Sequence, residues 1–275
     1  MYICPICKEK LTKENKSYYC SNRHCFDISK EGYVNLLPVQ KKNSLSPGDN
    51  KEMITARHNY LNEGAYDTLV QEIAKQIVSA TCDNSYNILD AGCGEGYYLE
   101  KIKYYITNDN PDSNVSLYGV DISKDAVKIG AKSYKDIDFC VGSVFDMPYK
   151  ESVFDVVLNV FAPFDNKEVV RVLKNDGILI KVVPSKTHLH EFRKIIYETV
   201  TEHEEKGIDT ASFDLVSKVN VKYSKHFDKN ETISSLYKMT PYYFNSSDES
   251  KEKILALNEI DLTIDFDVYV YRVSK

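Results

Sequence analysis

Short apolar runs recur through the middle of the chain, and several of them end at an aspartate or lead into a glycine. They lie at 87–91, 116–121, 138–142, 153–161 and 178–183. Each run is bounded by polar or turn-forming residues, which is typical of strands that are buried inside a parallel sheet. The pattern therefore predicts a strand at each of these five places.

Segments with helical patterns separate these runs. Besides the segment after the first strand, helices are predicted at 51–62, 66–81, 123–132 and 167–173. In the second of these helices, Leu69, Ile73 and Ile77 recur at helical spacing. Ser123 suits the N-cap of the third. Strands that alternate with helices predict an α/β fold whose parallel sheet spans about residues 86–184.

The segments before this core have other patterns. Residues 26–38 mix aromatic and aliphatic side chains without periodicity, and they predict short strands. The stretch 40–51 is polar and contains Pro47-Gly48, which predicts a loop and a domain boundary.

The segments after the core are more varied. A helix is expected from 188 to about 201, and a polar stretch to about residue 230 receives no element. Residues 236–244 predict an aromatic turn. The cleanly alternating segment 262–271 predicts a last strand.

Composition places the protein among ordinary globular chains. It has 275 residues, of which 43% are hydrophobic and 28% charged. No run approaches the roughly 18 apolar residues of a membrane helix. No signal peptide is visible at the N-terminus, so we expect a cytoplasmic protein without a membrane partner.

Charge is distributed unevenly along the chain. The net charge is −6, which argues against broad electrostatic binding of nucleic acid. Residues 1–60, however, carry ten Lys/Arg and six Asp/Glu, a balance of +4, which leaves −10 for the remainder. A basic front end on an acidic body suits a protein that touches a polyanion at one end only. Charge alone is equally consistent with a solvated surface.

Four of the seven cysteines fall within the first 25 residues. Cys4-x2-Cys7, twelve intervening residues and Cys20-x3-His24 form a spacing typical of a tetrahedral zinc site. A Cys20-x4-Cys25 pair would also supply the fourth ligand, although we favour His24. Such a closed site stabilises a segment that is too small to bury a core of its own. The remaining cysteines, Cys82, Cys93 and Cys140, are expected as small buried hydrophobes.

The first predicted strand runs into a loop with three glycines. Asp90 ends the strand, and Gly92, Gly94 and Gly96 alternate with other residues. Glycines allow positive φ and close approach of the backbone to a ligand. The second strand ends in Asp121, whose carboxylate can accept hydrogen bonds from both hydroxyls of a ribose. The sequences D-x-G-C-G-x-G and G-x-D-x-S resemble the S-adenosylmethionine loop of class I methyltransferases.

Taken with the cysteines, further motifs make the resemblance more specific. They are F-D-x-x-K-E-G-Y-V-N-L-L-P-V-Q at 26–40, L-D-x-G-C-G-E-G-Y-Y at 89–98, Pro47-Gly48-Asp49, Ala56-Arg57, Gly64-Ala65-Tyr66, Ala162-Pro163 and Met239-Thr240-Pro241. Over nearly its whole length, the chain resembles the large-subunit (23S) ribosomal RNA guanine-N1-methyltransferases of the RlmA type. The resemblance implies methyl transfer from S-adenosylmethionine to N1 of a guanine in an rRNA stem-loop. It also implies a homodimer whose zinc modules grip the RNA.

The same resemblance assigns fold, domains and site residues. It implies a class I methyltransferase Rossmann-like sheet, in which the last strand is often antiparallel at the sheet edge. Residues 1–40 would form a zinc-binding RNA-recognition module and 41–275 the methyltransferase domain, with a core at 86–184 and a substrate or lid region at 185–275. The implied zinc ligands are Cys4, Cys7, Cys20 and His24. The implied cofactor-binding residues are Tyr66, Asp90, Gly92, Gly94, Glu95, Gly96, Tyr97, Asp121 and His188.

The chemistry of the substrate end is less defined by the sequence. Guanine N1 carries a proton at neutral pH, so a base or hydrogen bonding to O6 would help its attack. The fourth strand ends at 159–165 without the N-P-P-Y pattern of enzymes that methylate exocyclic amines, which favours a ring nitrogen. Phe161 or Phe164 could stack on the base, and Asp165 suits an N-cap better than a base. No catalytic residue is assigned.

Some contacts stay open at this point. Ser143 stands where an acidic residue often contacts the adenine amine, and Asp146 is a candidate substitute. The sequence also does not specify which guanine is methylated, or whether methylation affects antibiotic resistance.

Two other function classes fit part of the sequence. A small-molecule methyltransferase would use the same core, with the C-terminal region as a lid, but it leaves the zinc module unexplained. A zinc-dependent binding protein that kept only the fold would not need the set Asp90, Gly92, Gly94 and Asp121.

Overall fold

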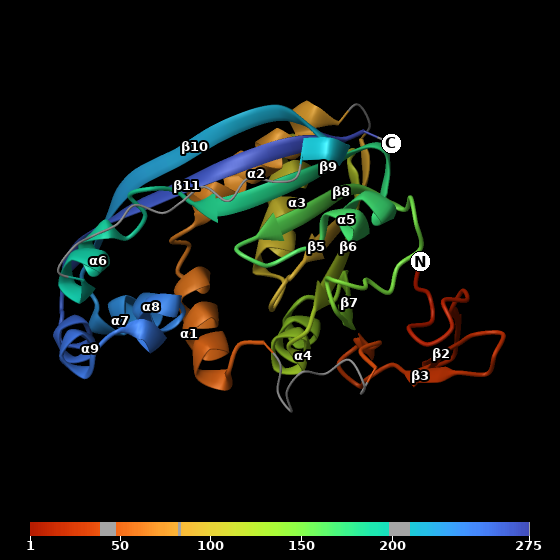
Figure 1. The fold of residues 1–275 in the computed structure, drawn as a ribbon, viewed down its shortest axis with the longest axis horizontal. Coiled ribbons are helices and arrows are strands. Elements are labelled where there is room, and N and C mark those ends of the chain that lie inside the picture. Colours follow the sequence, from red (N-terminus) through yellow and green to blue (C-terminus); the bar gives the residue numbers. More distant parts are fainter. Residues whose placement is uncertain (39–47, 82–83, 198–209, 275) are drawn as a thin grey trace.

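The computed structural model describes residues 1–38, 48–81, 84–197 and 210–274. Most of the predicted loop at 40–51, Cys82 and the expected end of the helix near residue 201 lie outside these residues. Figure 1 shows the N-terminal segment at one end of the molecule and the last helices at the other, with the sheet between them.

The N-terminal segment holds a small antiparallel sheet of order β1-β2-β3. Its strands are β1 (Thr12–Glu14), β2 (Ser17–Tyr19) and β3 (Cys25–Asp27). A fourth short strand, β4 (Val34–Asn35), leaves this sheet and pairs in parallel with β7 at the edge of the main sheet. The short strands predicted for 26–38 are therefore present, and they belong to two different sheets.

The main sheet has eight strands in the order β10-β11-β9-β8-β5-β6-β7-β4. The five predicted strands are confirmed as β5 (Ser85–Ala91), β6 (Asn114–Asp121), β7 (Ile137–Val141), β8 (Phe154–Val160) and β9 (Leu173–Pro184). They pair in parallel. The segment Asn175-Asp176-Gly177, whose residue types are typical of a tight turn, lies inside β9, where the register with β8 shifts and Asp176 takes a φ of 61°. The turn residues thus form an irregularity of the strand.

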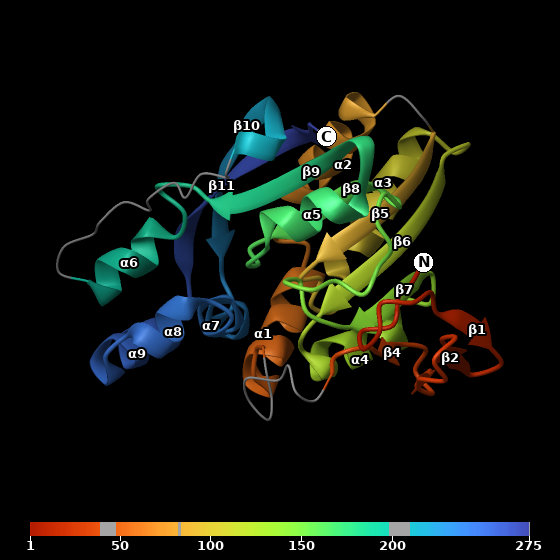
Figure 2. The same ribbon diagram turned by 45° about the vertical axis from the view of Figure 1, so that its right-hand side comes forward.

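Helices cover both faces of this sheet (Figures 1 and 2). The helices of the N-terminal half and core are α1 (Lys51–Asn62), α2 (Asp67–Ala80), α3 (Tyr97–Asp109), α4 (Lys124–Ser133) and α5 (Asn166–Val172). Neighbouring strand residues point to opposite faces: Ile88 packs in one apolar cluster with α2 and α3, whereas Leu89 packs in another with α5 and the N-terminal segment. Ser123 caps α4 as expected, since its hydroxyl accepts from the Ala126 N–H.

The C-terminal region differs most from the sequence expectation. It contains α6 (His190–Ile196), the 3₁₀ turn η2 (Thr210–Ser212), β10 (Phe213–Phe227), α7 (Asn230–Lys238), α8 (Pro241–Asn245), α9 (Asp248–Leu255) and β11 (Ile260–Val273). The polar stretch that received no element includes the whole of β10. The strand was missed because Lys218, Asn220 and Lys222 alternate with residues on its covered face, which makes the average composition polar.

Two further expectations for this region are corrected. The aromatic turn at 236–244 is the end of α7 followed by α8. The last strand, β11, is antiparallel to β9 as expected, but β10 lies outside it and forms the edge. Two long antiparallel strands thus extend the parallel core.

The N-terminal segment is attached to the core through Tyr2. The Tyr2 hydroxyl donates to Asp138 Oδ1 over 2.9 Å, and its ring stacks on Tyr149 with centroids 5.1 Å apart. Lys8 pairs with Asp146 at 2.5 Å, next to the backbone contacts of residues 1–3 with residues 148–150. The segment is therefore packed against the β7 end of the sheet as part of the same body.

Across the residues that the structure describes, no helix combines the length and the apolar character that crossing a membrane would require.

The Tyr2 contact can be tested by Tyr2→Phe. Burial raises the pKa of Asp138, and the Tyr2 hydrogen bond opposes that shift. Removal of the hydroxyl takes a hydrogen-bond donor from the part-buried Asp138 carboxyl group, so we expect the free energy of unfolding to fall by about 1 kcal/mol or more in urea denaturation. Tyr104→Phe, on a side chain that is 56% exposed, is the control and should change little. Equal effects of the two variants would contradict the role of Tyr2.

Candidate functional site

A cavity of about 810 Å³ lies at the carboxyl ends of β5, β6, β8 and β9. Helix α1 and the segment 239–242 supply further parts of its wall. This is the edge at which open α/β sheets bind ligands, and the volume falls within the range of about 300–1,000 Å³ for small-molecule sites.

The three glycines of the loop are required for different structural reasons. A Cβ at Gly92 (φ 92°) would lie 2.4 Å from the Ala162 side chain, and one at Gly96 (φ 86°) would lie 2.5 Å from Phe139. A Cβ at Gly94 (φ 54°) would meet no atom within 4 Å. Gly92 and Gly96 therefore permit close packing of the chain, whereas Gly94 leaves its backbone open to the cavity.

Asp121 connects this loop to the next strand and helix. Its Oδ2 accepts from the Gly94 N–H at 2.8 Å, and its Oδ1 accepts from the Ser123 N–H at 2.7 Å. Burial raises the pKa of Asp121, and these two hydrogen bonds oppose the shift. Each carboxylate oxygen keeps a second lone pair, so the group can accept two more hydrogen bonds from a ligand in the cavity.

Asp90 is placed differently from the expectation that it binds cofactor directly. It is 1% exposed and does not line the cavity. Within the described chain, neither of its carboxylate oxygens has a hydrogen-bond partner. Burial raises the pKa of Asp90 to about 8, and the nearby charge of Asp121 adds to this effect. Gly96 also lies outside the wall, at the N-terminus of α3.

Helix α1 brings two basic side chains, Arg57 and His58, to which no role was assigned from the sequence. His58 Nδ1 lies 2.6 Å from Oε2 of the buried Glu95, and Arg57 pairs with Asp49. Glu95 Oε1 is buried without a partner among the described residues. Burial raises the pKa of Glu95, which His58 and Arg57 oppose. Among the described residues, the cavity wall contains one Arg or Lys side chain, Arg57. It contains three acidic side chains, Asp49, Glu95 and Asp121.

One wall of the cavity is aromatic and centred on Phe266. The rings of Tyr66, Phe161 and His188 lie 5.0, 4.9 and 4.4 Å from it. Phe161, the residue after β8, has a φ of 56° and is partly exposed. Positive φ in a non-glycine residue is strained and concentrates at functional positions.

The remaining predicted residue, Tyr97, also lines the cavity, and its hydroxyl donates to Asp67 Oδ1 at 3.0 Å.

Three further candidates lie outside this wall: Asp146, considered for the adenine amine, and Phe164 and Asp165, considered for the substrate end. Asp146 pairs with Lys8, although its neighbour Ser143 lines the cavity. Asp165 caps α5 by accepting from the Glu168 N–H at 3.0 Å, which is the role we favoured. Phe164 packs under the Lys181 ammonium, 5.1 Å from its ring centre.

A second cluster of chemical groups lies in the N-terminal segment. Ligand atoms of Cys4, Cys7, Cys20 and His24 all fall within 4.8 Å of one another. His24 Nδ1 is 3.4 Å from the sulfurs of Cys4 and Cys20, close to the edges of a tetrahedron around zinc. Cys25 is exposed and contacts Asp27 instead. The geometry therefore brings together the four expected ligands, with His24 rather than Cys25 as the fourth.

Comparisons with known proteins match both the N-terminal segment and the sheet region of this chain. Family models match at residues 2–45, described as "RlmA, N-terminal", a zinc ribbon, and at residues 82–232, described as "Methyltransferase domain". A Bacillus subtilis (strain 168) protein, provisionally named 23S rRNA (guanine-N(1)-)-methyltransferase YxjB, is 33% identical over 98% of this chain and 96% of its own. The 23S rRNA (guanine(748)-N(1))-methyltransferase of Streptomyces fradiae is 30% identical over 68% of this chain and 65% of its own.

A solved structure supports the fold alone. It is a chain of the complex between the Haloferax volcanii Trm112 methyltransferase activator and a methyltransferase. It has a TM-score of 0.50 and 17% identity, and the match covers 83% of this chain and 100% of that one.

The environment of Asp90 predicts an unusual pH dependence of stability. An aspartate in the unfolded chain has a pKa of about 3.9, and the folded value of about 8 is higher. Folding therefore favours the neutral carboxyl group. The contribution of Asp90 to the stability of the fold is complete below about pH 4 and is lost as the pH rises to about 8. The test measures the Tm of Asp90→Asn and of the wild type, both without ligand, across this pH range. The difference, variant minus wild type, should rise from about pH 4 to about pH 8 and then level off.

The exposed Asp112→Asn is the control and should give a flat difference across the same pH range. A flat profile for Asp90→Asn as well would contradict the raised pKa.

Proposed function

The chain belongs to the RlmA-type family of 23S ribosomal RNA guanine-N1-methyltransferases, and on this premise we propose that it transfers the methyl group of S-adenosylmethionine to N1 of a guanine in a stem-loop of 23S rRNA. The observation that carries the proposal is the match to a guanine-N1-methyltransferase relative along almost the full length of both chains. That match includes the zinc ribbon as well as the catalytic domain.

We propose that the cofactor lies against the glycine loop. The open side of Gly94 suits close approach of a ligand, and Asp121 has lone pairs in position for ribose hydroxyls. Three carboxylates in the wall suit a ligand that carries an ammonium and a sulfonium. The proposed contacts are Tyr66, Gly92, Gly94, Glu95, Tyr97, Asp121 and His188, while Asp90 and Gly96 would act by shaping the loop.

The bound cofactor supplies a methyl group that is already activated by its sulfonium. The protein's part is therefore to align the acceptor nitrogen and to exclude water. We propose that the strained Phe161 presents its ring to the target base at the mouth of the cavity. Asn159 lines the same region, where its amide donates to the Ala91 carbonyl at 3.1 Å and fixes the strand end. We assign no general base.

We propose residues 1–40 as the RNA-recognition module and residues 41–275 as the methyltransferase domain. Support comes from the basic balance of the first sixty residues and from the zinc-ligand group that braces this segment. A homodimer and a cytoplasmic location are part of the proposal, on the basis of the family resemblance. In a dimer, two such modules could grip one RNA.

The function is tested by incubating the protein with labelled S-adenosylmethionine and a 23S rRNA transcript. Label in the RNA and a reverse-transcriptase stop at one guanine support the proposal, because N1-methylation blocks Watson–Crick pairing. Binding of the cofactor without transfer to the RNA overturns it and favours the small-molecule methyltransferase.

Asp121→Ala tests the cofactor site. Loss of the carboxylate removes the proposed ribose contacts, so we expect the Kd for S-adenosylmethionine to rise about tenfold or more in calorimetry. Zinc content should stay at the wild-type level, which controls for general misfolding. An unchanged Kd would exclude the ribose role.

Cys4→Ser tests the N-terminal site. A serine cannot replace a thiolate ligand, so we expect loss of zinc by metal analysis and weaker RNA binding, with a smaller effect on cofactor affinity. Cys25→Ser is the matched control and should retain zinc. Zinc loss in Cys25→Ser, or none in purified wild type, would refute the ligand assignment.

A further inference from the structure

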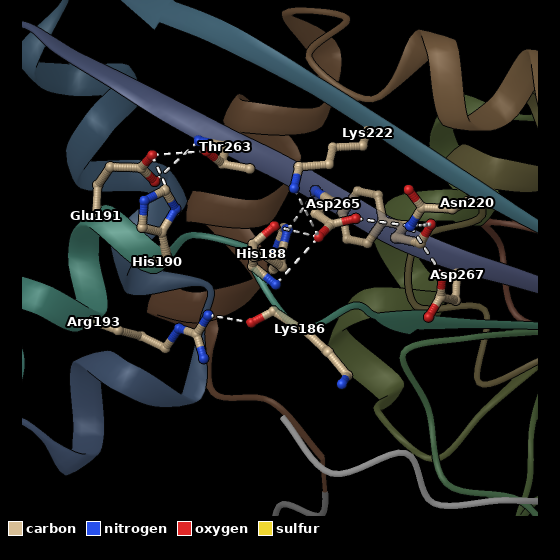
Figure 3. Close-up of polar contacts among 12 residues, drawn as sticks. Lys186, His188, His190, Glu191, Arg193, Asn220, Lys222, Thr263, Asp265 and Asp267 are labelled. Atoms are coloured by element: carbon tan, nitrogen blue, oxygen red, sulfur yellow. Dashed lines mark hydrogen bonds and ion pairs between the residues drawn. The ribbon is translucent and has the colours of Figure 1, made fainter. Parts of the chain in front are cut away.

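Strand β11 carries two buried carboxylates with no role in the site described so far. Asp265 and Asp267 are 3% and 4% exposed. The amide of Asn220 on β10 donates to both, at 2.8 and 3.0 Å (Figure 3). Lys222 lies 4.0 Å from Asp265, and Lys218 lies 3.5 Å from Asp267. The two aspartates thus have the same strand, burial and type of partners.

Asp265 differs from Asp267 because it also holds the turn that follows β9. Its carboxylate accepts from the Thr187 N–H at 3.2 Å and from the Thr187 hydroxyl, and its carbonyl accepts from the Ser185 N–H at 2.9 Å. Burial alone would raise the pKa of Asp265, but the hydrogen bonds from Thr187 and Asn220 outweigh it and the net shift is downward. Asp265 is thus an ionised anchor for this turn.

The same turn places His188 in the cavity wall. The backbone N–H of Asp265 donates to His188 Nδ1 at 3.3 Å (Figure 3). The imidazole ring also packs on Phe266, with the ring centroids 4.4 Å apart. A nitrogen that accepts a hydrogen bond carries no proton, so the proton of the neutral imidazole lies on Nε2. Asp265 therefore fixes both the position of the ring and the nitrogen that can donate.

We propose that Asp265 is a positioning residue that holds His188 as an Nε2–H donor to the carboxylate of the cofactor's amino-acid group. The inference rests on the proposed function. An oxygen anion is the ligand group that suits a neutral N–H donor. The acidic side chains of this wall are Asp49, Glu95 and Asp121, and Arg57, its one Arg or Lys among the described residues, already pairs with Asp49. Asp265 acts on cofactor affinity through His188 and does not touch the reacting atoms.

The test compares Asp265→Asn with Asp267→Asn, the same change on the same strand. We expect the Kd for S-adenosylmethionine to rise about tenfold in Asp265→Asn and less than twofold in Asp267→Asn. The Kd for decarboxylated S-adenosylmethionine should be the same in Asp265→Asn and wild type. In a His188→Ala background, Asp265→Asn should add no further loss.

Further variants keep the test decisive if Asp265→Asn folds poorly. Thr187→Val should reproduce the loss of affinity, and Thr187→Ser, which keeps the hydroxyl, should restore it. In the ligand-free protein, the imidazole ¹⁵N spectrum should show His188 protonated at Nε2 in the wild type and an altered tautomer balance in Asp265→Asn.

Equal losses in the two asparagine variants, or an equal loss for the decarboxylated cofactor, would overturn the inference. A wild-type protein that binds no S-adenosylmethionine would instead overturn the proposed function.

Discussion

The carboxylate of Asp121 holds together the part of the molecule on which the cavity depends. It accepts one backbone N–H from the glycine loop and one from the start of α4, so the ends of β5 and β6 are fixed to each other. The glycines make this arrangement possible, since a side chain at Gly92 would strike Ala162 beyond β8. The Asp121 carboxyl group thus joins the ends of β5 and β6, and the close approach of Gly92 to Ala162 brings the end of β8 beside them.

The walls around this centre come from segments that are far apart in the chain. Helix α1 carries Arg57 into the wall, and its His58 contacts the wall residue Glu95. Glu52 of the same helix pairs with Lys238 of α7 at 3.0 Å. Residues 239–242, which follow α7, line the same cavity. The beginning and the end of the catalytic region therefore meet over the ligand site. A ligand in the cavity would therefore contact both α1 and residues 239–242, the segments that meet there.

The sequence predicted the parallel core because its strands are buried on both faces and form continuous apolar runs. The family resemblance assigned Tyr66 and His188 to cofactor binding, and the position of Asp121 at a strand end suggested a ribose contact. All three line the cavity. Strand β10 was missed because one of its faces is polar. The pairing of His58 with Glu95, 37 residues apart, could not be foreseen, since it depends on how α1 lies over the loop. The same holds for Asp146, which turned out to pair with the N-terminal Lys8.

The two-residue strand β4 has a consequence for the behaviour of the protein in solution. An eight-stranded open sheet has two edges, and unpaired edges promote association between sheets of different molecules. At one edge, β10 carries Lys218, Lys222 and Lys225, and charged side chains of this kind discourage edge-to-edge aggregation. At the other edge, β4 covers β7 and belongs to the segment that the metal ligands brace. The cover over this edge and the metal ligands therefore belong to one segment, so loosening of that segment on metal loss would weaken the protection of β7.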